Sequence, residues 1–168
     1  VKNDFNRLQI DLFDNMIIDS ILLGGQKCTY TREFNAVFVD VPKQHSGTEA
    51  TLRTYYQGRP VIAKNAPWDG GFVWKTDTNK NPWVAVACEG TGASLWWPCK
   101  DHPADEPDSL RFSMTVPHSL TCISNGNLIG KTPLGDGKNK FHWKVTYPIN
   151  LYNVTFYAGD YYLIDDEY

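Results

Sequence analysis

The residues able to do chemistry are spread along the chain without the spacing that a catalytic centre needs. Hydrolysis at a protein-bound metal commonly uses two histidines one helical turn apart with a glutamate between them, because HExxH aims both imidazoles at one ion. The four histidines, His45, His102, His118 and His142, include no such pair. The chain also has no G-x-S-x-G elbow, no P-loop and no glycine-rich dinucleotide turn. We therefore expect no catalytic residue and no metal or cofactor site in this chain.

One cysteine and one histidine lie close enough in sequence to suggest a nucleophile and its base. Cys99 and His102 are three residues apart, but the segment around them is rich in proline and supplies no recognisable group to orient the imidazole. We favour a packing role for Cys99 beside Trp96 and Trp97, because free cysteine behaves as a small hydrophobic residue.

Carboxylates gather in the segment that follows. Asp101, Asp105, Glu106 and Asp108 lack the D-x-[DN]-x-[DN]-G spacing of a calcium loop and its closing glutamate. A solvated acidic loop is the simpler interpretation.

Tryptophan and cysteine are the other residue types that could mark a site. The six tryptophans could form a platform for stacking sugars, although large aromatic residues in a β-protein first of all fill the core. They are Trp68, Trp74, Trp83, Trp96, Trp97 and Trp143. The four cysteines, Cys28, Cys88, Cys99 and Cys122, have no CxxC spacing, so we expect buried thiols and not a zinc ribbon or a redox motif.

Length and charge limit the possible partners. The 168 residues fit one domain, residues 1–168, with a core large enough to need no disulfides. A net charge of -3, with 16 scattered Lys and Arg, provides no basic surface for nucleic acid. The longest apolar runs are far shorter than the roughly 20 residues of a membrane-spanning helix, so we expect no membrane span.

The elements that must position any site are strands. Apolar residues alternate with polar ones, the period that only a strand produces, in five segments: 8–12, 37–41, 52–56, 110–116 and 141–147. Turn residues separate them at 24–25, 58–60, 69–71, 125–127 and 135–137. This pattern predicts an all-β sandwich of about ten antiparallel strands. Residues 88–108 break the rhythm and predict a long ordered loop, where function often lies.

The same loop carries a family resemblance. The stretch from Ala87 to Asp101, ACEGTGASLWWPCKD, resembles the signature segment in the N-terminal domain of M1 aminopeptidases, in which a Gln-x-Glu or Gln-x-Gln precedes a P-C-x-D motif. Glu89 stands ten residues before Cys99, as the acidic residue does in many members of that family. Residues 113–117 and 124–126 resemble the next strand pair, and residues 56–60 resemble an upstream Y-x-G-x-P element.

The resemblance covers nearly the whole chain and implies a saddle-shaped β-sandwich. Its partner within the parent protein would be a zinc catalytic domain carrying HExxH, so this chain would be a substrate-recognition and structural domain, inactive alone and shortened at both ends. Exposed strand edges in such a fragment would favour self-association. The sequence around Trp96 and Trp97 resembles that of periplasmic or secreted bacterial members of the family. The resemblance therefore implies a periplasmic or secreted protein.

Glu89 is the one residue to which the resemblance assigns a binding role. In the family this position helps hold the free α-ammonium group of a peptide substrate, and a desolvated carboxylate suits a cation through charge-assisted hydrogen bonds. Two departures affect the neighbouring contacts: Ala87 stands where the family usually has Gln, and residues 101–107 form a longer loop than usual. Two alternatives remain open, namely that Glu89 is an ordinary loop carboxylate and that the chain is a free-standing β-sandwich module binding carbohydrate or protein.

Overall fold

The computed structural model describes residues 1–164 and 166, and in that part of the chain it contains thirteen β-strands, two short 3₁₀ helices and no α-helix. The predicted all-β class, built of antiparallel sheets, is confirmed. The chain separates into two compact units. The first unit comprises Val1–Val61 and Gly92–His102, and the second unit comprises Ile62–Thr91 and Pro103–Tyr168. The chain thus leaves the first unit, returns to it for eleven residues, and leaves it again.

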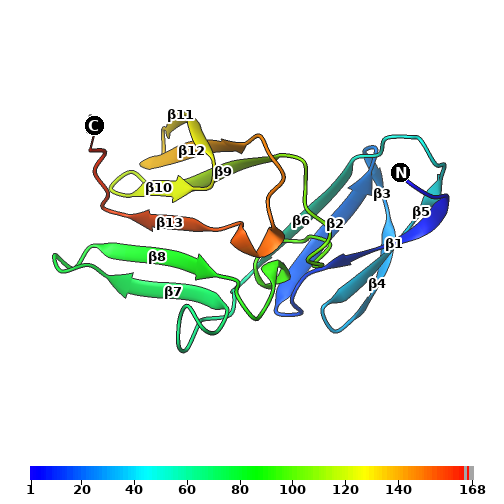
Figure 1. The fold of residues 1–168 in the computed structure, drawn as a ribbon, viewed down its shortest axis with the longest axis horizontal. Helices are drawn as coiled ribbons and strands as arrows, with labels where there is room; N and C mark the ends of the chain where they lie inside the picture. Colours follow the sequence, from blue (N-terminus) through cyan, green and yellow to red (C-terminus); the bar gives the residue numbers. More distant parts are fainter. Residues whose placement is uncertain (165, 167–168) are drawn as a thin grey trace. The chain divides into compact units, whose positions relative to one another are not determined.

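Two three-stranded antiparallel sheets build the first unit, and Figure 1 shows their strands in blue and cyan. One has the order β1-β5-β4 and the other β3-β2-β6. The strands are β1 (Phe5–Asp11), β2 (Met16–Leu23), β3 (Gln26–Lys27), β4 (Thr29–Glu33), β5 (Ala36–Gln44) and β6 (Leu52–Gly58). Alternate residues of these strands form one buried cluster, which includes Ile10, Ile18, Ile21, Val37 and Val39. The period of two in the sequence therefore does select the core face.

A half-buried arginine closes one end of the first unit. The Arg32 guanidinium donates hydrogen bonds to three backbone carbonyl groups, those of Leu12 (2.5 Å), Met16 (2.8 Å) and Phe34 (3.1 Å). The first two carbonyls lie on either side of the turn between β1 and β2. Because backbone carbonyls need a donor when they are removed from water, Arg32 fixes this turn from the side.

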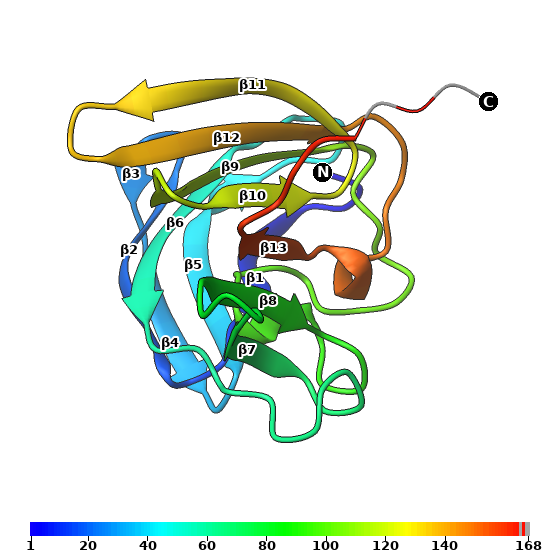
Figure 2. The same cartoon turned by 90° about the vertical axis from the view of Figure 1, so that its left-hand side faces the viewer.

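The second unit contains a four-stranded sheet of order β10-β13-β8-β7 and a three-stranded sheet of order β11-β12-β9. Figure 2 shows the four strands one below the other in this order. The strands are β7 (Gly71–Thr76), β8 (Pro82–Ala87), β9 (Leu110–Pro117), β10 (Thr121–Ser124), β11 (Asn127–Leu134), β12 (Lys138–Val145) and β13 (Phe156–Gly159), and the short helices are η1 (Ala93–Leu95) and η2 (Leu151–Asn153).

The five strands predicted from alternation correspond to β1, β5, β6, β9 and β12. Strand β8 shows no alternation because both of its faces are buried, as the burial of three consecutive residues, Val84, Ala85 and Val86, shows. Strands as short as β3 or β10 contain too few residues to show a period. The long segment between β8 and β9 is confirmed to contain no strand.

We expect Arg32→Met to lower the free energy of unfolding by about 2–4 kcal/mol, because the substitution leaves carbonyl groups without a donor. Denaturant unfolding followed by circular dichroism measures the change. Arg53→Met is the matched control, because Arg53 is exposed on β6 of the same unit, and it should stay within about 0.5 kcal/mol of wild type. Equal effects of the two substitutions would contradict the structural role of Arg32.

Candidate functional site

Glu89 lies in a tight turn at the end of strand β8. The Thr91 amide donates to the Cys88 carbonyl at 3.2 Å, and Gly90 follows Glu89 with φ 72°. This is the type II arrangement, which needs a residue without a side chain at its third position. The Glu89 side chain is exposed, and it forms no hydrogen bond or ion pair within the part of the chain that the structure describes. A negative charge is thus presented at a fixed corner and remains available to a ligand.

The loop that precedes the neighbouring strand β7 holds this turn in place. Residues 62–70 precede β7, and the Gly70 amide donates to the Thr91 hydroxyl at 2.9 Å. The loop itself is closed by Asp69, whose carboxylate accepts the backbone N–H groups of Lys64 (2.7 Å) and Asn65 (2.5 Å). The turn and the loop therefore form one ordered surface of the second unit.

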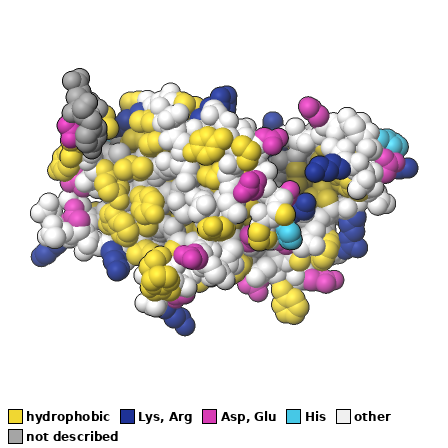
Figure 3. Space-filling model, viewed as in Figure 1, with side chains coloured by type: hydrophobic (Ala, Val, Ile, Leu, Met, Phe, Trp, Pro, Cys, Tyr) yellow, Lys and Arg dark blue, Asp and Glu magenta, His cyan; other side chains and the backbone are white. Residues whose placement is uncertain are grey.

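The tryptophans divide between core and surface. Trp96 is 8% exposed and fills the core as expected, whereas Trp68 and Trp74 are 74% and 58% exposed, so the core-filling interpretation is wrong for these two. Trp74 stacks on Phe72 with ring centroids 6.0 Å apart. Figure 3 shows hydrophobic side chains gathered over β8 and β13 of the second unit, where Trp83 and Tyr157 pack with centroids 6.2 Å apart.

The segment Gly92–His102 belongs to the first unit, and its one acidic residue, Asp101, organises it. The Asp101 carboxylate accepts the backbone N–H groups of Ala93 (3.2 Å) and Ser94 (3.0 Å) at the start of η1. Gly92 has φ 99°, and a Cβ atom there would overlap the Asp101 carboxylate. Asp101 is therefore a capping residue and not the solvated loop carboxylate that the sequence predicts.

Backbone pairing attaches this segment to the end of β1. Asp11 and Cys99 exchange two hydrogen bonds, at 2.7 and 3.1 Å, and the Phe13 amide donates to Ser94 at 2.9 Å. The Tyr56 hydroxyl donates to the Trp96 carbonyl at 3.0 Å, and burial raises the pKa of Tyr56 to about 12, with a smaller contribution from Cys99. The Cys99 side chain is buried, which agrees with a packing role.

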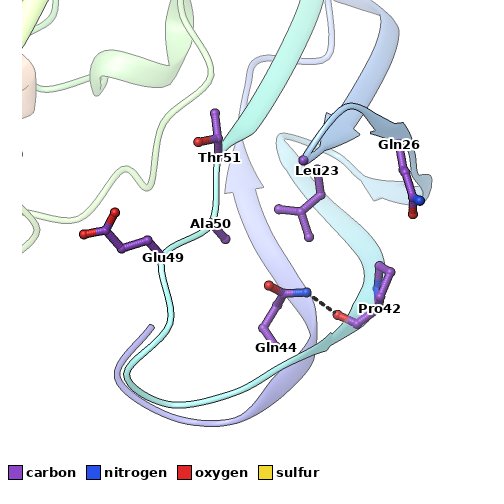
Figure 4. A pocket seen from close by; sticks show the side chains of 8 residues that line it. Leu23, Gln26, Pro42, Gln44, Glu49, Ala50 and Thr51 are labelled. Atoms are coloured by element: carbon purple, nitrogen blue, oxygen red, sulfur yellow. Dashed lines mark hydrogen bonds between the residues drawn. The ribbon is translucent and has the colours of Figure 1, made fainter.

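Other candidate positions show little that could bind or react. The pocket in Figure 4 has a volume of about 450 Å³ and is lined by residues such as Leu23, Gln44 and Glu49. The side-chain amide of Gln44 already donates a hydrogen bond to the Pro42 carbonyl at 2.7 Å. The described residues include no group of three His, Cys, Asp or Glu side chains that could hold a metal ion. No helix among them is both long enough and apolar enough to cross a membrane.

Comparison with known protein families decides where the chain belongs. Residues 4–152 match the model of the Peptidase M1 N-terminal domain. The chain is a member of the M1 peptidase N-terminal domain family. The match spans most of the sequence, and it does not favour an unrelated binding module. No curated protein sequence matches the chain closely enough to count as a relative.

Solved structures of M1 zinc metallopeptidases share this fold. One from Deinococcus radiodurans superimposes with a TM-score of 0.78 at 21% identity, over 95% of this chain and 35% of that chain. A mutant of the Deinococcus radiodurans enzyme bound to a Tyr-Ser-Ala substrate gives a TM-score of 0.79 over the same shares. A two-domain M1 enzyme bound to L-arginine gives 0.80 at 21% identity, again over 95% and 35%. The chain thus spans about a third of the length of these structures.

The M1 signature segment therefore divides between the two units. Its first part, with Glu89, belongs to the second unit, and its P-C-x-D part belongs to the first. The motif alone gave no sign of Trp68 or of the loop 62–70 that fixes the Glu89 turn. The turn residues at 69–71 were the available signal, since Asp69 and the glycine after it commonly close such loops.

We expect Asp101→Ala to lower the free energy of unfolding by about 2 kcal/mol, because two backbone N–H groups lose a charged acceptor. Urea unfolding measures the loss. Glu106→Ala, an exposed carboxylate in the following segment, is the control and should change little. If both variants unfold at the wild-type urea concentration, Asp101 does not act as a cap.

The raised pKa of Tyr56 predicts a loss of stability in alkali. In the unfolded chain Tyr56 ionises near its usual pKa of 10.0 and in the folded chain near 12, so its contribution is present below pH 10 and is lost between pH 10 and 12. Wild type should therefore be more stable than Tyr56→Phe at pH 8, and the gap should narrow by pH 12. Urea unfolding of both proteins at several pH values tests this, and a gap that does not change with pH would count against it.

Proposed function

We propose that this chain is the substrate-recognition and structural domain of an M1 zinc aminopeptidase, with catalysis supplied by a zinc domain elsewhere in a longer polypeptide. The observation that carries the proposal is the Glu89 carboxylate, which is exposed and has no partner in the described residues. The described residues of this chain do not provide a ligand set for zinc, so the metal would be held by the other domain.

A carboxylate is suited to bind the free α-amino group, which only the first residue of a peptide has. A free α-amino group is cationic at neutral pH, and its three N–H donors match the acceptor oxygens of a carboxylate. Holding that group fixes the distance from the peptide terminus to the first peptide bond. An enzyme that removes single residues from the amino terminus needs such an anchor.

The ordered turn that carries Glu89 favours ligand binding. The type II turn and the bond between Gly70 and Thr91 fix the backbone that carries this side chain, so the backbone loses little conformational freedom when a ligand binds. An ordinary loop carboxylate would need no such support. The related enzyme solved with a Tyr-Ser-Ala substrate is consistent with a peptide ligand.

In the full-length polypeptide we expect Glu89→Ala to lower kcat/KM for substrates with a free amino terminus by about 10- to 150-fold, the equivalent of one hydrogen bond to a charged group. The fold should be retained because the side chain is exposed. Paired kinetics on aminoacyl anilides and their N-acetyl analogues measure the effect.

The N-acetyl analogues carry no cation, so their low rates should hardly change. Glu106→Ala serves as the control carboxylate. An unchanged kcat/KM for the free-amine substrates would mean that Glu89 is only a loop carboxylate, and the recognition role would be lost.

A further inference from the structure

The residue that stands out beside the Glu89 turn is an exposed tryptophan. Trp68 has 74% of its surface in solvent, although a tryptophan normally loses most of its surface on folding. It belongs to the loop 62–70, and a Cβ atom on Gly90 would lie 3.9 Å from the Trp68 carbonyl oxygen. The backbone of Trp68 is thus next to the turn that presents Glu89.

Hydrogen bonds within the loop fix the backbone at Trp68. The Trp68 amide donates to the Asn65 carbonyl at 3.0 Å. The carboxylate of the next residue, Asp69, accepts two backbone N–H groups. On the other side, Ala63 donates to the Phe72 carbonyl at 3.0 Å, which attaches the start of the loop to β7. These bonds fix the backbone that carries the exposed indole, so the backbone loses little conformational freedom when a partner contacts Trp68.

The same loop carries a second exposed apolar residue. Ile62, at the start of the loop, is 62% exposed and pairs with Phe72 in a parallel bridge. The loop 62–70 and the turn that its backbone approaches therefore carry two exposed apolar side chains and the Glu89 carboxylate. A ligand that matches these three side chains carries a cation and, attached to it, a hydrophobic group.

We propose that Trp68, with Ile62, contacts the side chain of the first residue of the peptide whose ammonium group Glu89 binds, and so selects peptides that begin with a large hydrophobic residue. This inference rests on the proposed function of Glu89. The α-carbon of an amino-terminal residue carries both the ammonium group and the side chain, so a residue anchored at Glu89 places its side chain within a few bonds of the carboxylate. Trp68 is a specificity-determining residue in this arrangement, and it takes no part in bond cleavage.

The test uses the full-length polypeptide and two substrates, the phenylalanine and alanine p-nitroanilides. Trp68→Ala should lower kcat/KM for the phenylalanine substrate by about 10-fold or more and for the alanine substrate by less than about 3-fold, because only the larger side chain reaches the indole. Trp68→Phe should keep most of the preference. Tyr147→Ala, which removes another exposed aromatic residue of the same unit, is the control and should leave both rates unchanged.

The outcomes separate this inference from the proposed function. If Glu89→Gln lowers both rates while Trp68→Ala leaves their ratio at the wild-type value, the ammonium role stands and the side-chain role is overturned. If Trp68→Ala lowers both rates by the same factor, the residue supports packing of the longer polypeptide and the inference is likewise overturned. If Glu89→Gln leaves both rates unchanged while Trp68→Ala changes their ratio, the ammonium role of Glu89 fails, and the inference that rests on it is overturned as well. Should Trp68→Ala fail to fold, the ratio in Trp68→Leu decides, with an unchanged preference for phenylalanine counting against the inference.

Discussion

The Asp101 carboxylate is the contact on which the returning segment Gly92–His102 of the first unit depends. It accepts two backbone N–H groups at the start of η1, while its own amide donates to the Asp11 carboxylate at 3.0 Å. The returning segment Gly92–His102 has no regular strand or long helix to satisfy its backbone, so these bonds replace a secondary structure. Gly92 is part of the same constraint, because any side chain there would occupy the position of the carboxylate.

The M1 signature therefore combines two kinds of residue. Cys99 and Asp101 attach the segment Gly92–His102 to the first unit through buried packing and capping. The Glu89 side chain, in contrast, forms no hydrogen bond or ion pair with the described residues. The two groups are separated by the point at which the chain passes from one unit to the other, between Thr91 and Gly92. A short motif can thus contain residues with structural contacts and a residue without them, and the two kinds respond to mutation in different ways.

The all-β class and five strands could be predicted from the sequence, because a period of two marks a strand that has one buried and one exposed face. Alternation at Val37 and Val39 or at Phe141 and Val145 located β5 and β12 directly. Strand β8 could not be found in this way, since both of its faces are buried. The site was only partly predictable: the spacing to Cys99 pointed to Glu89, but the bond from Gly70 to Thr91 joins residues 21 positions apart. The return of residues 92–102 to the first unit depends on such distant bonds as well.

The four cysteines have a consequence for how the chain folds in the presence of oxidants. All four are buried, none is disulfide-bonded, and burial raises the pKa of Cys122 to about 11. At neutral pH the buried Cys122 side chain is therefore a thiol and not a thiolate, the form that attacks a disulfide. Burial shields all four cysteines from oxidants in the folded chain, whereas an unfolded chain exposes all of them at once. A compartment that oxidises thiols would cross-link the chain only before it folds, so the order of folding and oxidation decides whether native protein is obtained.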